Sequence, residues 1–73
     1  MTYREMYDNV VMSEKYPSGM AKVKQLAQLI YANDRTADKE DCVVAALEHY
    51  EDMTGRYLDP THEEWESIRD SII

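Results

Sequence analysis

Histidine, cysteine and carboxylate residues can hold a metal ion, but few of them occur here at spacings that suit such a site. His62 precedes a glutamate, as in zinc-protease helices, yet position 66 holds Glu66 instead of the second histidine that the i, i+4 geometry requires. His49 with Asp52, or with Cys42, supplies two or three candidate ligands along one helix edge, an arrangement that chance commonly produces. We therefore expect no metal site and no cofactor.

Cys42 is the only cysteine of the chain and cannot form an internal disulfide. As a nucleophile it would need a base, a group that orients the base and an oxyanion hole, and only His49 is even remotely placed to take part. A thiol at the edge of the core is the better interpretation. The two glycines stand 36 positions apart, which excludes a glycine-rich phosphate loop. We expect no catalytic residues and a protein that is not an enzyme.

The most informative pattern lies in a helix that we expect to begin after Thr36 or Asp38. It should stop at Gly55, because glycine just past a helix end accepts left-handed geometry. Projected at about 100° per residue, its core stripe comprises Val43, Ala46, Leu47, Tyr50, Met53 and Thr54. The neighbouring stripe comprises, in angular order, Glu40, Glu51, Val44, Glu48, Asp41 and Asp52. Val44 is thus the one apolar residue in a group of carboxylates.

This acidic stripe has two interpretations. An apolar residue rimmed by charge is typical of a partner-binding face, because the apolar centre is desolvated on contact while the rim steers the partner. The stripe can equally be a solvated helix face with one stray valine, since scattered exposed apolar residues are normal. The pattern alone leaves both interpretations open.

Three further helices are expected from capping residues and apolar spacing. Residues 2–5 and 61–64 each form a capping-box pattern. The first pattern favours a helix over about residues 3–14, and the second favours a last helix that begins after Thr61. A helix between them has Ser18 as a candidate N-cap and ends near Asn33. The predicted fold is an all-α single-domain bundle of four short helices over residues 1–73. Its expected core contains Tyr7, Val10, Val23, Leu26, Ile30, Val43, Leu47, Tyr50, Trp65 and Ile68.

Charge is distributed unevenly along the 73 residues, whose formal net charge is −7. Residues 1–32 carry four basic and three acidic groups, whereas residues 33–73 carry four basic and twelve acidic groups. Such a field repels nucleic-acid phosphates and anionic lipid and attracts basic surfaces. We therefore expect a basic protein partner, with neither direct nucleic-acid binding nor membrane binding. The N-terminal residues lack the pattern of a secretory signal, which favours a cytoplasmic location.

Two segments resemble a known family. Val23-Lys24-Gln25-Leu26 with Ile30 and Asp34, followed by residues 47–54 (Leu-Glu-His-Tyr-Glu-Asp-Met-Thr), are similar to the first two helices of the colicin and pyocin DNase immunity proteins. The resemblance covers about half of the chain. It implies a small acidic four-helix inhibitor that binds and neutralises a basic nuclease toxin. The paired tyrosines of that family's short third helix have no counterpart here, and residues 1–15 have none in the family.

The resemblance adds contact residues to those of the acidic stripe. Carried over by the match, the family's partner contacts fall on Glu40, Val43, Val44, Leu47, Glu48 and Glu51. With the rest of the stripe, the expected partner-binding residues are Glu40, Asp41, Val43, Val44, Leu47, Glu48, Glu51 and Asp52. The protein is thus expected to inhibit or regulate its partner.

A weaker similarity links this chain to the Hha-type expression modulators. It runs through Ala45-Ala46, His49, Thr54, Leu58, Trp65 and Ile68-Arg69, and it implies a regulator that docks on a nucleoid or transcription protein. A third alternative is a phage-type inhibitor whose carboxylates imitate DNA phosphates and occupy the groove of a nucleic-acid-binding protein.

Overall fold

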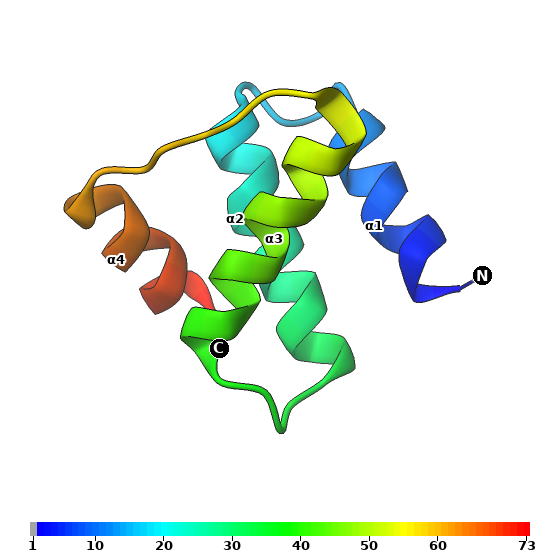
Figure 1. Ribbon diagram of the computed structural model, residues 1–73. Coiled ribbons are helices and arrows are strands. Elements are labelled where there is room, and N and C mark those ends of the chain that lie inside the picture. The colour runs from blue at the N-terminus through cyan, green and yellow to red at the C-terminus, as the bar shows by residue number, and fades with distance from the viewer. Residues whose placement is uncertain (1) are drawn as a thin grey trace.

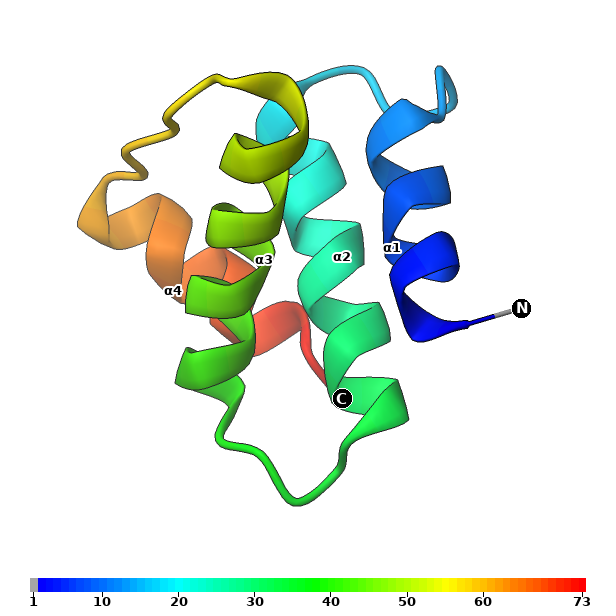
Figure 2. The same ribbon diagram turned by 45° about the vertical axis from the view of Figure 1, so that its right-hand side comes forward.

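Four helices make up the computed structural model, which describes residues 2–73 (Figure 1). They are α1 (Tyr3–Met12), α2 (Gly19–Asn33), α3 (Lys39–Thr54) and α4 (His62–Ser71). Helix α2 packs against each of the other three helices, with α1 on one side and α3 on the other (Figure 2). The all-α architecture expected from the sequence is confirmed.

The helix ends lie where capping chemistry places them. The side-chain hydroxyl oxygens of Thr2 and Ser18 accept hydrogen bonds from backbone amides of the first turns of α1 and α2, at 3.2 and 3.1 Å. Thr61 forms the complete capping box at the start of α4. Gly55 ends α3 in the left-handed conformation, with φ of 71°. Helix α1 is shorter than expected, because the chain turns extended at Ser13.

The core forms where the four helices meet. Five of its ten expected residues are buried, namely Val23, Leu26, Val43, Tyr50 and Ile68. The other five are partly buried against them, namely Tyr7, Val10, Ile30, Leu47 and Trp65. Val11, Ala27, Cys42, Ala46 and Ile72 are also buried. Cys42 therefore lies inside the core, deeper than the edge position expected for it.

Helix α1 is joined to the rest of the bundle by polar contacts as well as apolar ones. The His49 ring of α3 lies 2.9 Å from a carboxylate oxygen of Asp8 and meets the Tyr7 ring edge-on, with 5.9 Å between ring centroids. The Asn33 amide donates to the Tyr7 hydroxyl at 3.3 Å. His49 thus has a structural partner on α1.

The chain segment that follows α3 is fixed by a close approach to the start of α2. A Cβ atom added at Gly19 would lie 2.5 Å from the Tyr50 hydroxyl oxygen and 3.3 Å from a methyl carbon of Leu58. Glycine is therefore needed here for space. The absence of a side chain at Gly19 lets Tyr50 of α3 and Leu58 of the following segment approach the start of α2 closely.

Candidate interaction groove

An open groove of about 290 Å³ runs along the outer side of α3. We call it the α3 groove. It is lined by Val44, Leu47, Glu48, Glu51, Tyr57, Leu58, Asp59, Pro60 and Trp65. One wall is α3, and the other is the non-helical segment between α3 and α4 together with the first turns of α4. The volume is close to the lower end of the range typical of ligand pockets.

Local structure on both walls explains why these side chains converge. On α3, positions 44, 47, 48 and 51 follow the i, i+3, i+4, i+7 spacing and share one helix face. On the opposite wall, the left-handed Gly55 reverses the chain, and the Thr61 capping box fixes where it becomes helical again. Residues 57–60 are therefore held in a non-helical conformation between two defined ends.

The floor of the groove is apolar and accessible. Val44 is 41% exposed, and Tyr57 on the opposite wall is 73% exposed. Leu47, Leu58 and Trp65 are partly buried against the core. Side chains of this kind lose water-exposed apolar surface when a partner covers them, at about 25 cal/mol per Å². The floor can therefore contribute affinity to a contact.

The rim of the groove is acidic. Glu48 and Glu51 are exposed on the α3 side and Asp59 is exposed on the other. Within residues 2–73, none of these three carboxylates lies within 4.0 Å of a basic side chain. Their charge is thus left uncompensated by nearby salt bridges, and the rim presents negative potential on both sides of an apolar floor.

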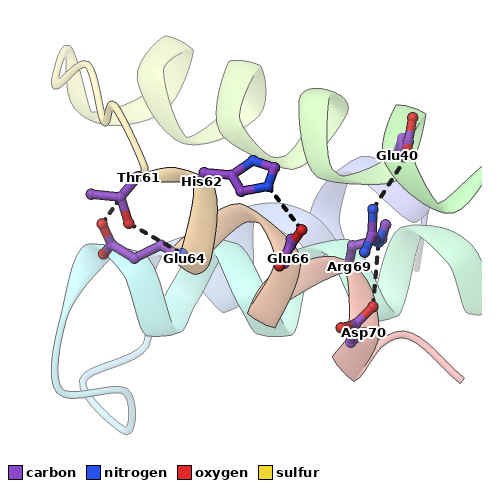
Figure 3. A network of polar contacts seen from close by, with 7 residues as sticks. All are labelled: Glu40, Thr61, His62, Glu64, Glu66, Arg69 and Asp70. Carbon is purple, nitrogen blue, oxygen red and sulfur yellow. Dashed lines mark hydrogen bonds and ion pairs between the residues drawn. The ribbon is translucent and has the colours of Figure 1, made fainter.

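Several carboxylates elsewhere on α3 and α4 have polar partners, as Figure 3 shows. The Arg69 guanidinium contacts Asp70 at 3.3 Å and Glu40 at 3.5 Å, which links α4 to the start of α3. The hydrogen bond and charge of Asp70 raise the pKa of Arg69 above its ordinary value. His62 lies 2.9 Å from Glu66 one turn along α4. These pairs lie at both ends of α4, and none of them includes Glu48, Glu51 or Asp59.

The structure brings half of the expected partner-binding residues together and separates the other half. Val44, Leu47, Glu48 and Glu51 line the α3 groove. Val43, by contrast, is 0% exposed and belongs to the core, so it cannot contact a partner while the bundle is intact. The apolar spacing of α3 already placed it in the core stripe, and only the family resemblance assigned it to the partner.

The remaining three expected residues are exposed but lie outside the groove. Glu40 pairs with Arg69 at the far end of α3, and Asp41 is exposed in the first turn of that helix. Asp52 lines a separate cleft of about 270 Å³ with Arg4, on the side of α3 that faces α1. The acidic stripe is therefore divided along α3: Glu40 and Asp41 lie in its first turn, whereas Asp52 lies on the side that faces α1.

Sequence reasoning missed the second wall. Tyr57, Leu58, Asp59 and Pro60 lie in a segment without helical or strand periodicity, and Trp65 was assigned to the core alone. The available indication was the presence of two large apolar residues next to Asp59-Pro60 in a short connection. Periodicity could not show which helix face that connection would follow.

Besides Arg69, two titratable groups outside the groove have shifted pKa values with clear causes. Burial, reinforced by the negative charges of Asp34, Asp41 and Asp38, raises the pKa of the Cys42 thiol. Hydrogen bonds from Thr36 lower the pKa of Asp34 in the turn between α2 and α3.

No group of three His, Cys, Asp or Glu side chains in residues 2–73 is arranged to hold a metal ion. No helix in the same range combines the length and apolar character needed to cross a membrane.

Searches against protein-family models, curated proteins and solved structures find no match to this chain.

Proposed function

We propose that this protein is a non-enzymatic binding module that docks on a basic protein partner through the α3 groove and thereby inhibits or regulates it. The observation that carries the proposal is the combination of an accessible apolar floor with a rim of carboxylates that have no basic partner within residues 2–73. A basic surface can satisfy the rim and cover the floor at once.

The two parts of the groove contribute differently to such a complex. Burial of the floor, centred on Val44 and Leu47, stabilises the complex and slows dissociation. The rim accelerates encounter through a long-range field that salt screens over about 10 Å at 0.1 M ionic strength. The net charge of −7 adds to the attraction for a basic partner.

The similarity to DNase immunity proteins agrees with this proposal for part of the site. Its most specific segment, residues 47–54, contributes Leu47, Glu48 and Glu51 to the groove. A basic nuclease toxin is accordingly one class of partner to test. The weaker similarity to Hha-type modulators also includes two groove residues, Leu58 and Trp65. This favours a nucleoid or transcription protein as the second candidate class.

The test compares charge reversals on and off the groove. Once a basic partner has been captured and purified, association and dissociation rates are measured by surface plasmon resonance for the wild type, Glu48→Lys and Asp70→Lys. Asp70 is a control of the same charge, exposed and outside the groove, and its pair with Arg69 lies at the surface, where such pairs contribute little. Glu48→Lys should slow association several-fold at low salt, and the loss should shrink as salt rises.

Two results would contradict the proposal. If Asp70→Lys slows association as much as Glu48→Lys, the carboxylates act only as a diffuse field and the α3 groove has no special role. If short duplex DNA displaces the protein and every removed carboxylate costs a similar amount of affinity, imitation of DNA phosphates explains the binding better.

A further inference from the structure

The size of the α3 groove limits what can occupy it, and this inference rests on the proposed function of that groove. Its second wall is residues 57–60, which span at most about 14 Å even when fully extended. A helix that docks lengthwise spreads its anchors, at i, i+3, i+4 and i+7, over about 10 Å and needs room for four side chains instead of one. The groove, at about 290 Å³, has room for much less than that.

We infer that the α3 groove takes one large apolar side chain, presented by a short segment of the partner that carries lysine or arginine on both sides of it. The floor of Val44, Leu47 and Leu58 supplies the apolar surroundings for the inserted side chain. Trp65 and the exposed Tyr57 add aromatic surface at the edges. Aromatic faces of this kind also attract a neighbouring ammonium or guanidinium group.

The placement of the carboxylates explains why basic residues are needed on both sides. Glu48 and Glu51 stand on the α3 wall, whereas Asp59 stands on the wall formed by residues 57–60. A segment that crosses the floor therefore meets negative charge before and after its central side chain. Each cation gains a partner without any salt bridge of this protein being broken, because the three carboxylates are unpaired within residues 2–73.

Charge also argues against a second copy of this chain as the occupant. Two copies with α3 grooves facing each other would bring six rim carboxylates together, and each copy has a net charge of −7. Like charges that face each other across an interface repel and disfavour such a dimer. A basic segment is the complementary choice.

The experiment uses the fluorescence of Trp65, the single tryptophan of the chain, which lines the groove. The probe is the peptide Gly-Lys-Lys-Phe-Lys-Lys-Gly, acetylated and amidated at its ends. One control peptide replaces the phenylalanine with glycine and keeps the charge, and another replaces the four lysines with serines and keeps the phenylalanine. At low salt the probe should produce a saturable change in emission, with a Kd at least ten-fold lower than that of either control.

Variants tie that binding to the groove. Glu51→Gln should raise the Kd of the probe at least three-fold, whereas Asp70→Asn, which removes one charge outside the groove, should change it less than two-fold. Val44→Ala should raise the Kd without changing the far-UV circular dichroism of the free protein. Amide chemical shifts in two-dimensional NMR provide a second readout, and the largest changes should fall on residues 44–51 and 57–65.

Each alternative result overturns a definite part of the inference. Equal affinity of the glycine control shows that no side chain is inserted, and equal affinity of the serine control shows that the flanking cations are unnecessary. Shift changes outside the groove, or a Kd unaffected by Glu51→Gln, place the peptide elsewhere. If none of the peptides binds while the intact partner still depends on Glu48, the proposed function stands and the inserted side chain is wrong.

Discussion

Replacing Gly19 with alanine tests the contact that positions the second wall of the groove. At an ordinary helical position, Gly→Ala stabilises a protein by about 0.4–1 kcal/mol, because it restricts the unfolded chain. Here the new Cβ would lie 2.5 and 2.9 Å from the hydroxyl oxygen and Cζ of Tyr50, and 3.3 Å from Leu58. Tyr50 is a buried ring in the core and cannot simply swing aside. We therefore expect Gly19→Ala to destabilise the protein.

The magnitude follows from the two opposing effects. Insertion of a methyl group into a well-packed site costs about 1–3 kcal/mol, which exceeds the entropic gain. A net loss of about 1–2 kcal/mol is expected, and this would lower Tm by about 4–8 °C per kcal/mol in a domain of this size. Urea denaturation followed by far-UV circular dichroism measures it, with an unchanged m value showing that compactness is preserved.

A double-mutant cycle assigns the loss to the named contact. Tyr50→Phe removes the oxygen nearest to the new Cβ, so Gly19→Ala should cost about 1 kcal/mol less in the Tyr50→Phe background than in the wild type. If Gly19→Ala instead raises the urea midpoint, or costs the same in both backgrounds, then Tyr50 does not approach the start of α2 in this way. The position of Leu58, and with it the second wall of the groove, would then need revision.

Three further predictions concern single residues. Val44→Ala should change the free energy of unfolding by less than about 0.5 kcal/mol, because Val44 is 41% exposed and alanine favours the helix. The same substitution should weaken partner binding by about 0.7–1 kcal/mol, measured by calorimetry. As a control, Met53→Ala should leave the affinity unchanged, because Met53 is 37% exposed on the same helix but lies outside the groove. Because the pKa of Asp34 is lower in the folded protein than in the unfolded chain, its carboxylate stabilises the fold above the unfolded pKa, and this contribution disappears as pH falls through the folded pKa. Asp34→Asn should therefore flatten the acid side of a plot of Tm against pH. An unchanged plot would show that the hydrogen bonds from Thr36 add nothing to stability. Cys42, buried and with a raised pKa, should react with a thiol reagent at neutral pH only as fast as the protein opens, and immediate stoichiometric labelling would contradict its place in the core.

Helix positions could be predicted because their determinants are local. Ser18 and Thr61 hydrogen-bond within three residues of their own positions, and Gly55 needs only its own left-handed backbone. The buried ring of Tyr50 and the exposure of Val44 followed from the helical spacing of α3. These features depend on residues close together in the sequence.

The second wall of the groove could not be predicted in this way. The position of Leu58 depends on its packing near Gly19, 39 residues earlier, and no local pattern reports such a contact. The expectation that Val43 contacts the partner came from the family resemblance alone, whereas the helical spacing of α3 placed it in the core, where the bundle buries it completely. Burial of Ile72 likewise depends on where the end of α4 meets the bundle.

The division of the groove into a helical wall and a non-helical wall has a consequence for how its specificity can evolve. One face of α3 packs in the core and another lines the groove. Most changes to the sequence of α3 therefore affect the stability of the fold. Residues 57–60 lie between Gly55, which ends α3, and Thr61, which caps the start of α4. Connections of this kind tolerate insertions and deletions. Gain or loss of one residue there would change the width and charge of the groove while leaving the helices in place. Related chains can thus acquire different partners through this short connection, without first acquiring a new core.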